Sequence, residues 1–314
     1  MDFVIFILAM GALIIGADFI VNQSERIALR FNISEFVIGA TIIALGTSLP
    51  EMAASIAANL GGKPEISIAN AVGSNIFNIT LVLGVIFIIT KKIHPHRDFF
   101  KKDTTWALVP VMLFLLMAID GYIGRVDAIL LLFLMLAYIL FLLQDSPDLA
   151  SIDLETREDK DQGFLWINAL LLLFLGFIFV VGGAHFAIES ASNIATEFGV
   201  SEWVIGIVMI SFGTSLPELV ISVSAAFKGK VDMAIGNVIG SNLANTTMVI
   251  GLSALVEKLP ISLSKSAFDL STMTAATIML IYITANKLYS KPAGIALLIL
   301  FALFIDHTIQ SMVH

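Results

Sequence analysis

Long apolar segments alternate with short polar turns along the whole chain. Ten of these segments come close to the ~20 residues that a helix needs to cross a bilayer. Backbone groups inside lipid must be hydrogen-bonded within the spanning structure, and the alternation typical of a β-barrel is missing. The pattern therefore predicts an all-α integral membrane protein with ten transmembrane helices. The predicted spans are 3–22, 35–59, 66–90, 105–119, 126–143, 164–188, 202–227, 233–256, 267–286 and 293–310.

The pattern repeats itself after 167 residues. Residues 31–84 align without a gap on residues 198–251, with 26 identities over 54 positions. The hexapeptide GTSLPE occurs in both copies and ends at Glu51 and Glu218. Each half contains five predicted spans, an odd number, so the second half must enter the membrane from the opposite side. Inverted repeats with a binding site at their interface are typical of secondary transporters.

The predicted organisation is therefore a first five-helix repeat (1–143), a linker (144–163) and a second, inverted five-helix repeat (164–314). The linker region has seven acidic residues against two basic ones and lacks the spacing of an EF-hand, so it is interpreted as a solvated connection. Thirteen of the 17 Lys and Arg residues lie on the same side of the ten-span arrangement as this linker. The positive-inside rule assigns that side to the cytoplasm, which leaves both termini outside.

Composition supports this interpretation and excludes several kinds of chemistry. The chain is 58% hydrophobic and 13% charged, whereas a soluble domain is about a quarter charged. It contains no Cys, which excludes disulfides, thiolate metal sites and Cys nucleophiles. Neither repeated block contains His, which argues against zinc and copper. We expect a monomer in the plasma membrane that has no nucleic-acid partner and no cofactor.

The GTSLPE hexapeptides lie in the middle of the second and seventh predicted spans. Proline lacks an N–H and clashes with the carbonyl four residues before it, so each helix is expected to break there and free backbone oxygens near Thr47 and Thr214. A charged side chain at the centre of a spanning helix costs ~2.5–3.5 kcal/mol or more. Glu51 and Glu218 are therefore functional candidates.

The third predicted span adds polar residues four positions apart, and the eighth repeats them. The two sets are Asn70, Ser74 and Asn78 with Gly73, and Asn237, Ser241 and Asn245 with Gly240. Two bidentate carboxylates and two freed carbonyls supply about six oxygens, within the range that Ca²⁺ takes. The Ser, Thr and Asn side chains suit a monovalent hard cation, although such residues also hold membrane helices together.

Two copies of GTSLPE, each followed by GSN-x-x-N, resemble the α-repeats of the Ca²⁺/cation antiporter superfamily, in particular the prokaryotic sodium/calcium exchangers. This resemblance implies a transporter, not an enzyme, that exchanges Ca²⁺ for Na⁺ while its first and sixth helices slide across a rigid core. It implies a Ca²⁺ site of the Glu51 and Glu218 carboxylates with backbone oxygens of Thr47 and Thr214. The Na⁺ ligands that it implies are Ala44, Ser48, Ser74, Asn78, Ser211, Ser215, Ser241 and Asn245.

One position departs from the family pattern. Many sodium/calcium exchangers have Asp where this chain has Asn245, so two acids are left in the site instead of three. This keeps open an antiporter of the same fold that is coupled to H⁺ or another cation. An intramembrane hydrolase that uses the carboxylate pair is the third reading. It is poorly supported, because the chain has no HExxH motif, no paired Asp motif and no Ser–His arrangement within the spans.

Overall fold

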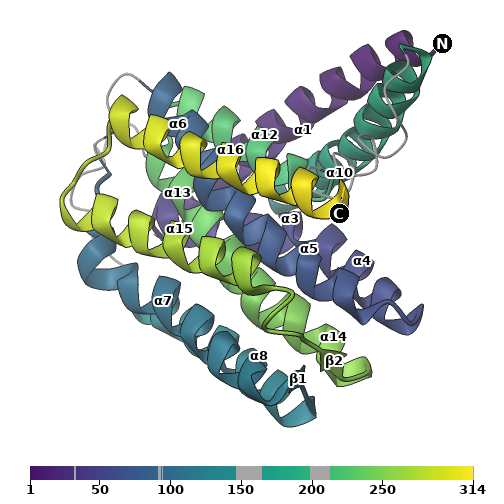
Figure 1. Ribbon diagram of the computed structural model, residues 1–314. Helices are drawn as coiled ribbons and strands as arrows, with labels where there is room; N and C mark the ends of the chain where they lie inside the picture. The colour runs from purple at the N-terminus through teal and green to yellow at the C-terminus, as the bar shows by residue number, and fades with distance from the viewer. Residues whose placement is uncertain (32, 91–92, 94, 146–164, 199–212, 314) are drawn as a thin grey trace.

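The computed structural model describes residues 1–31, 33–90, 93, 95–145, 165–198 and 213–313. Nine helices in this part of the chain are long and apolar enough to cross a membrane. A further apolar helix, Leu216–Phe227, is the described part of the seventh predicted span. The predicted all-α membrane fold is confirmed. The helices of the first and second halves lie side by side, so that their colours alternate across the molecule (Figure 1).

The helices before the linker follow the predicted spans closely. They are α1 (Asp2–Phe31), α2 (Glu35–Ile38), η1 (Gly39–Ile43), α3 (Ala44–Thr47), α4 (Leu49–Leu60), α5 (Pro64–Phe77), η2 (Asn78–Val82), α6 (Leu83–Ile89), α7 (Phe99–Met117), the 3₁₀ turn η3 (Ala118–Asp120) and α8 (Arg125–Gln144). The first helix continues well beyond its predicted end at residue 22. Its last turns carry polar residues, so they lie outside the apolar window although the backbone stays helical.

The helices after the linker repeat this order. They are α10 (Trp166–Glu197), α12 (Leu216–Phe227), α13 (Val231–Ala244), η4 (Asn245–Val249), α14 (Ile250–Val256), α15 (Ala267–Ala285) and α16 (Lys291–Val313). The sequence did not predict two short strands, β1 (Tyr122–Ile123) and β2 (Leu259–Pro260). They pair antiparallel and connect a turn of the first half to a turn of the second.

In the first half the helix breaks at Ser48, between α3 and α4, and in the second half α12 begins at the equivalent position, directly after Ser215. Ser48 (φ −82°, ψ 1°) and Ser215 (φ −91°, ψ 1°) have almost the same non-helical conformation. Pro50 and Pro217 then occupy the first turns of α4 and α12, where the missing N–H costs no intrahelical hydrogen bond. The break that the sequence predicts is therefore present in the first half, and the described residues of the second half have the matching conformation at Ser215.

In the part of the chain that the structure describes, three π-helical turns widen the helices near these breaks. They are η1, η2 and η4. The third residue of each turn is a threonine whose hydroxyl donates to a carbonyl one turn earlier: Thr41 to Val37, Thr80 to Ile76 and Thr247 to Leu243, all at 2.6 Å. Such hydroxyls satisfy carbonyls that a widened turn leaves without an amide partner. Isolated π turns are frequent at functional sites, and hydropathy alone gives no signal for them.

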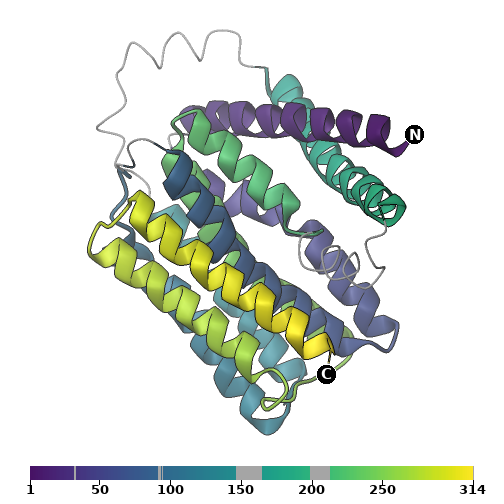
Figure 2. The same ribbon diagram turned by 45° about the horizontal axis from the view of Figure 1, so that its top comes forward.

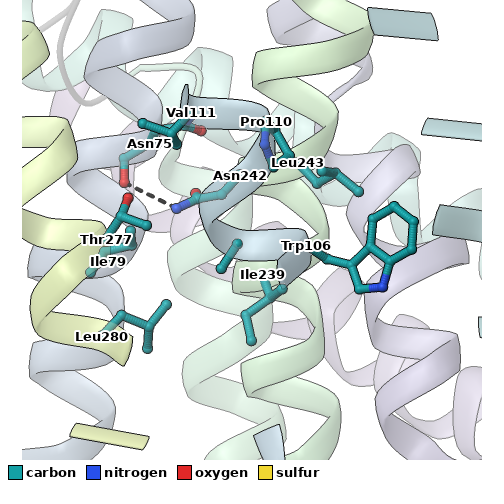
Figure 3. A pocket seen from close by; sticks show the side chains of 11 residues that line it. Asn75, Ile79, Trp106, Pro110, Val111, Ile239, Asn242, Leu243, Thr277 and Leu280 are labelled. Atoms are coloured by element: carbon teal, nitrogen blue, oxygen red, sulfur yellow. Dashed lines mark hydrogen bonds between the residues drawn. The ribbon is translucent and has the colours of Figure 1, made fainter. Parts of the chain in front are cut away.

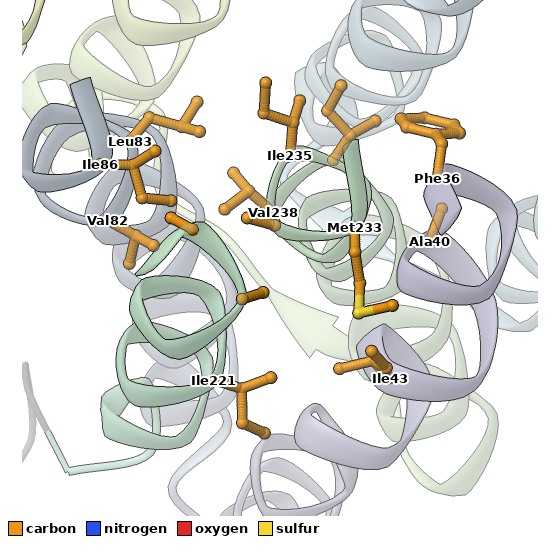
Figure 4. Close-up of a cluster of buried hydrophobic side chains, with 14 of the residues drawn as sticks. Phe36, Ala40, Ile43, Val82, Leu83, Ile86, Ile221, Met233, Ile235 and Val238 are labelled. Carbon is orange, nitrogen blue, oxygen red and sulfur yellow. The ribbon is translucent and has the colours of Figure 1, made fainter. Parts of the chain in front are cut away.

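The core is built around α13, which packs backbone to backbone against the α2–η1 stretch. A side chain at Gly39 would collide with the carbonyl of Met233, and one at Gly236 would collide with the carbonyl of Phe36. On the other side of α13, Val82, Leu83 and Ile86 of η2 and α6 complete the buried cluster (Figure 4). Glycine allows these helices to approach closely, as is common between membrane helices.

α1 and α10 form an arm that projects from the other helices (Figure 2). They cross near Gly16 and Gly176, where a Cβ at residue 16 would lie 2.7 Å from the carbonyl oxygen of Gly176. The ring of Phe177 on α10 packs directly on Gly46 of α3, so a side chain at position 46 would collide with it. The arm therefore reaches the first GTSLPE break.

The turn between α12 and α13, which we call the lysine turn (residues 228–230), is bound to the arm by ion pairs. Lys228 contacts Asp18 and also donates to Asn22 at 2.8 Å. Lys230 Nζ lies 2.8 Å from Glu25 Oε1 and 2.7 Å from Glu35 Oε1. Burial alone would lower the pKa of Lys230, but hydrogen bonds and charge from the two glutamates outweigh it and raise the pKa. The contribution of this lysine to stability is present below its ordinary pKa and is lost only as the pH rises through the raised value.

We expect Lys230→Met to destabilise the protein by about 1–3 kcal/mol, because it leaves two partly buried carboxylates facing each other. The repeat-equivalent Lys63 is exposed, so Lys63→Met is the matched control and should change stability by less than about 0.5 kcal/mol. The midpoint of thermal unfolding in detergent at neutral pH measures both. Equal midpoints for the two variants would contradict a stabilising role for the lysine turn.

Candidate functional site

Glu51 and Glu218 are the most deeply buried acids of the described chain. Each lies in the first turn of its helix, one residue after the proline, and each is 0% exposed. None of their four carboxylate oxygens has a hydrogen-bond partner among the described residues. Two unpaired carboxylates inside a protein are strongly unfavourable unless a cation compensates them.

Neutral polar side chains around the two glutamates are also left without partners. Asn78 and Asn245 begin the π turns η2 and η4, and both are 0% exposed. Neither the amide oxygen nor the amide nitrogen of these two residues is hydrogen-bonded within the described part of the chain. The hydroxyl of Ser48 is likewise buried and unpaired. Unpaired buried groups are rare in folded proteins, so a cluster of them points to a bound species.

One amide, that of Asn70, connects the two breaks. Its Nδ2 donates to the backbone oxygen of Glu51 at 3.3 Å and to Ser55 Oγ at 3.0 Å. Its Oδ1 accepts from Thr214 Oγ1 at 3.1 Å. A single side chain of α5 thus contacts the Glu51 turn and the segment just before Glu218. The two GTSLPE segments are brought together across the interface between the halves.

Two further contacts cross the same interface. Ser215 Oγ donates to Ser74 Oγ at 3.0 Å, and Thr47 Oγ1 lies 3.4 Å from Ser241 Oγ. The structure therefore places these four sequence-predicted residues in direct contact, two from each half. All four are fully or largely buried.

Two predicted Na⁺ ligands, Ala44 and Ser211, differ from the others in what the structure shows of them. The carbonyl of Ala44 accepts from Thr47 Oγ1 at 3.1 Å and from the Ser48 amide at 3.0 Å, so both of its lone pairs are used in this conformation. Ser211 lies outside the described residues. The remaining predicted ligands are grouped around the two breaks as described above.

Asn75 and Asn242, the Asn residues of the two GSN motifs, lie apart from the glutamates. They line a small cavity together with Trp106, Pro110 and Thr277 (Figure 3). Asn242 Nδ2 donates to the backbone oxygen of Asn75 at 3.3 Å. Asn75 Nδ2 donates to Thr246 Oγ1 at 2.8 Å. These repeat-related residues hold α5 and the α13–η4 stretch together. The occurrence of Asn at both positions is therefore explained by helix contacts and is not in itself evidence of ion ligation.

The donor set fits a hard cation. Within the described residues no group of three or more His, Cys, Asp and Glu side chains converges, so the site has two acids and otherwise neutral oxygens. Carboxylates, hydroxyls, amide oxygens and carbonyls are the ligands that Ca²⁺ and Na⁺ prefer, whereas zinc and copper favour nitrogen and sulfur. Two carboxylates balance the charge of one divalent ion or of two monovalent ions.

Comparison with protein families gives one match that covers most of the chain. Residues 1–144 and 168–309 match the family described as sodium/calcium exchanger protein. The first matched segment ends at residue 144 and the second begins at residue 168, so the gap between them corresponds to the acidic linker.

Among curated relatives, the sodium/calcium exchanger MaX1 of Methanosarcina acetivorans is 30% identical over 97% of this chain and 97% of its own length. An uncharacterized membrane protein of Methanocaldococcus jannaschii, MJ0091, is 39% identical over 81% of this chain and 82% of its own length. Among solved structures, the sodium-calcium exchanger NCX_Mj soaked with 2.5 mM Na⁺ and 1 mM Sr²⁺ superposes with a TM-score of 0.83. It is 34% identical and covers 97% of both chains.

Proposed function

This chain belongs to the sodium/calcium exchanger protein family, and we propose that it exchanges Ca²⁺ for Na⁺ across a membrane through a single site between Glu51 and Glu218. The observation that carries this proposal is the burial of four carboxylate oxygens without a hydrogen-bond donor among the described residues. A protein that did not bind cations there would gain stability by replacing these carboxylates with neutral side chains.

In the Ca²⁺-bound state, the two carboxylates and the backbone oxygens of Thr47 and Thr214 surround the ion. The charges balance, because two carboxylates carry −2 and Ca²⁺ carries +2. The breaks before Pro50 and Pro217 serve this site, since a continuous helix would keep these backbone oxygens in its own hydrogen bonds. Open backbone inside a membrane protein is tolerated where it lines a binding cavity.

In the Na⁺-bound state, two Na⁺ ions replace the Ca²⁺ ion and share the same carboxylates. The Na⁺ ligands proposed from the sequence are Ser48, Ser74, Asn78, Ser215, Ser241 and Asn245, with Ala44 and Ser211 completing the set. The unpaired amides of Asn78 and Asn245 and the unpaired hydroxyl of Ser48 support this assignment. Ca²⁺ and two Na⁺ cannot be bound together, because the site would then carry excess positive charge. This competition couples the two fluxes.

The transport cycle follows from the two-half organisation. We infer ten spans in two inverted five-helix repeats, 1–143 and 164–314, in the plasma membrane, with both termini outside. The arm of α1 and α10 slides across the helices that hold the glutamates and exposes the site to one side at a time. The close crossing at Gly16 and Gly176, where Ile20 and Val180 pack on the glycines, supports movement of α1 and α10 as one unit. The protein works as a monomer in this scheme.

The function is tested by Ca²⁺ uptake into proteoliposomes that carry, in turn, an outward Na⁺, K⁺ or H⁺ gradient. We expect uptake with the Na⁺ gradient at a rate at least about tenfold above that with K⁺ or H⁺. Such a ratio corresponds to only about 1.4 kcal/mol of selectivity between the ions. Uptake driven by the H⁺ gradient but not by Na⁺ would replace Na⁺ coupling with proton coupling on the same scaffold.

A further inference from the structure

The two GTSLPE breaks form different hydrogen bonds although their sequences are identical. We call residues 46–48 the first hinge and residues 213–215 the second hinge. At the second hinge, Thr214 Oγ1 donates to Asn70 Oδ1 at 3.1 Å and Ser215 Oγ donates to Ser74 Oγ at 3.0 Å. Both acceptors lie on α5. The second hinge is therefore attached to a helix of the first half by two side-chain hydrogen bonds.

The equivalent bonds are missing at the first hinge. Thr47 Oγ1 donates to the carbonyl of Ala44 and lies 3.4 Å from Ser241 Oγ, whereas its repeat-equivalent partner would be Asn237, four residues earlier on α13. Asn237 Oδ1 and Ser48 Oγ have no hydrogen-bond partner within the described chain, although these residues are 1% and 0% exposed. Buried polar atoms are seldom left unpaired. Asn237 Oδ1, which is not assigned to an ion, therefore marks a hydrogen bond that belongs to another conformation.

The difference does not come from the orientation of the two asparagines. Asn70 Nδ2 donates to Ser55 Oγ at 3.0 Å, and Asn237 Nδ2 donates to the repeat-equivalent Ser222 Oγ at 2.9 Å. Each amide thus donates to the serine four residues after the glutamate of its own half, and Asn70 donates in addition to the backbone oxygen of Glu51. The shared Asn–Ser bond directs the Nδ2 atom of both amides to their own half and leaves Oδ1 available to the hinge of the other half.

The helices that carry the two glutamates are also packed differently, and the more tightly packed one, α12, again belongs to the second hinge. α1 packs along α12, and the lysine turn adds ion pairs to that contact. The repeat-equivalent helices α10 and α4 have at most marginal contact within the described residues. Accordingly, Ile221 of α12 is 1% exposed, whereas the equivalent Ala54 of α4 is exposed. The face of α12 that carries Ile221 is therefore covered, whereas the equivalent face of α4 is exposed.

From these observations we propose that Asn70 and Asn237 are positioning residues that select the access state by binding one hinge at a time. In the conformation described here, the second hinge is bound to Asn70 and Ser74, whereas the first hinge has only the longer contact between Thr47 and Ser241. In the opposite access state, Thr47 donates to Asn237, Ser48 pairs with Ser241, and the bonds of Thr214 and Ser215 are released. This proposal rests on the exchange function proposed above, because the two hinges supply the backbone oxygens assigned to Ca²⁺.

The exchange of bonds explains how both states can be populated. Each state contains one Thr–Asn and one Ser–Ser hydrogen bond and leaves one asparagine oxygen and one serine hydroxyl unpaired. The hydrogen bonds that are formed and broken between the two access states are therefore of the same chemical types. Neither hinge by itself strongly favours one access state. A ligand can shift such an equilibrium by its difference in affinity for the two states. Binding a hinge also fixes the direction of its carbonyl, which links the switch to ion binding.

The switch is tested by cysteine labelling of the full-length protein in ion-free detergent solution. The chain contains no Cys, so Ala54→Cys and Ile221→Cys give single reporters on the exposed face of α4 and the covered face of α12. Thr214→Val should raise the labelling rate at residue 221 relative to residue 54 by about three- to tenfold, the effect of one net hydrogen bond. Thr47→Val should change the ratio by a similar factor in the opposite direction. The double variant should return the ratio to within about twofold of the parent, because it removes one bond from each state.

Thr→Ser at either hinge keeps the hydroxyl and should keep the parent ratio, whereas a purely structural role of the threonine methyl group would not be rescued. Asn237→Ala should act in the same direction as Thr47→Val, which provides a second variant if a hinge variant fails to fold. Single variants that shift the ratio in the same direction, or not at all, would overturn the proposal. Labelling without ions does not depend on which ion is transported, so this result is separate from the uptake assay.

Discussion

Glu51→Gln is expected to lower Na⁺-driven Ca²⁺ uptake by about 150- to 5,000-fold, the effect of removing one partner from a buried charge interaction worth about 3–5 kcal/mol. The carboxylate would supply half of the negative charge around a divalent ion in a site with little water. An amide of the same shape has one oxygen and no charge, so it cannot replace this contribution. Glu218→Gln should have an equally large effect, because the two glutamates occupy equivalent positions in the two halves.

Initial rates of Ca²⁺ uptake into proteoliposomes measure this effect. Glu65→Gln is the matched control, because Glu65 is an exposed acid at the start of α5, and its uptake should stay within about twofold of the native rate. Loss of uptake through misfolding is distinguished by thermal unfolding in ion-free buffer. There the Gln variants should be at least as stable as the native protein, because they remove a buried unpaired charge. Near-native uptake in either Gln variant would remove that glutamate from the site.

Asn245→Asp is expected to make exchange strongly dependent on pH and on membrane voltage. The substitution adds a third carboxylate to the buried set of residues proposed for the site. Three carboxylates around one Ca²⁺ cannot all remain ionised in a buried site, so the Ca²⁺-bound variant should hold a proton. The added charge also offers a place for a third Na⁺. The variant should therefore bind Na⁺ with a steeper Hill slope, and protons should compete with Na⁺ so that its exchange falls in acid.

The native protein, with two acids, is expected to have a lower Na⁺ Hill slope and a weak voltage dependence, because one Ca²⁺ and two Na⁺ carry the same charge. Isotope flux at clamped membrane potential measures both properties between pH 6 and 8. Asn78→Asp places the same charge at the repeat-equivalent position, so a matching pH dependence would show that the number of carboxylates matters more than their side. Steep, electrogenic Na⁺ dependence in the native protein would contradict the two-acid charge argument.

The chain directly encodes the features that arise from local physical chemistry. Apolar segment length predicted the membrane helices, since every lipid-exposed backbone group must be paired within its helix. Pro50 and Pro217 predicted the breaks, because a missing N–H acts on its own helix wherever that helix lies in the fold. The cost of burying a carboxylate identified Glu51 and Glu218 before any contact was known.

Other features could not be predicted because they depend on which surfaces meet. The π turns at Asn78 and Asn245 widen helices whose hydropathy is that of ordinary spans. The lysine turn binds acids that lie about 200 residues earlier in the chain. The use of Asn75 and Asn242 in helix contacts, and not beside the glutamates, is equally hidden in the GSN motif. In each case the residue type allows several partners, and tertiary packing selects one.

The clearest division concerns the two hinges. The sequence by itself determined that they are equivalent, because residues 46–51 and 213–218 are identical and are followed by the same asparagines and serines. Only the tertiary structure decided that Thr214 is bound to Asn70 while Asn237 has an unpaired oxygen. A repeated sequence fixes the set of hydrogen bonds that each half can form. Because the two halves share one interface and one arm, packing the arm against α12 leaves α4 uncovered, and the identical hinges acquire different partners.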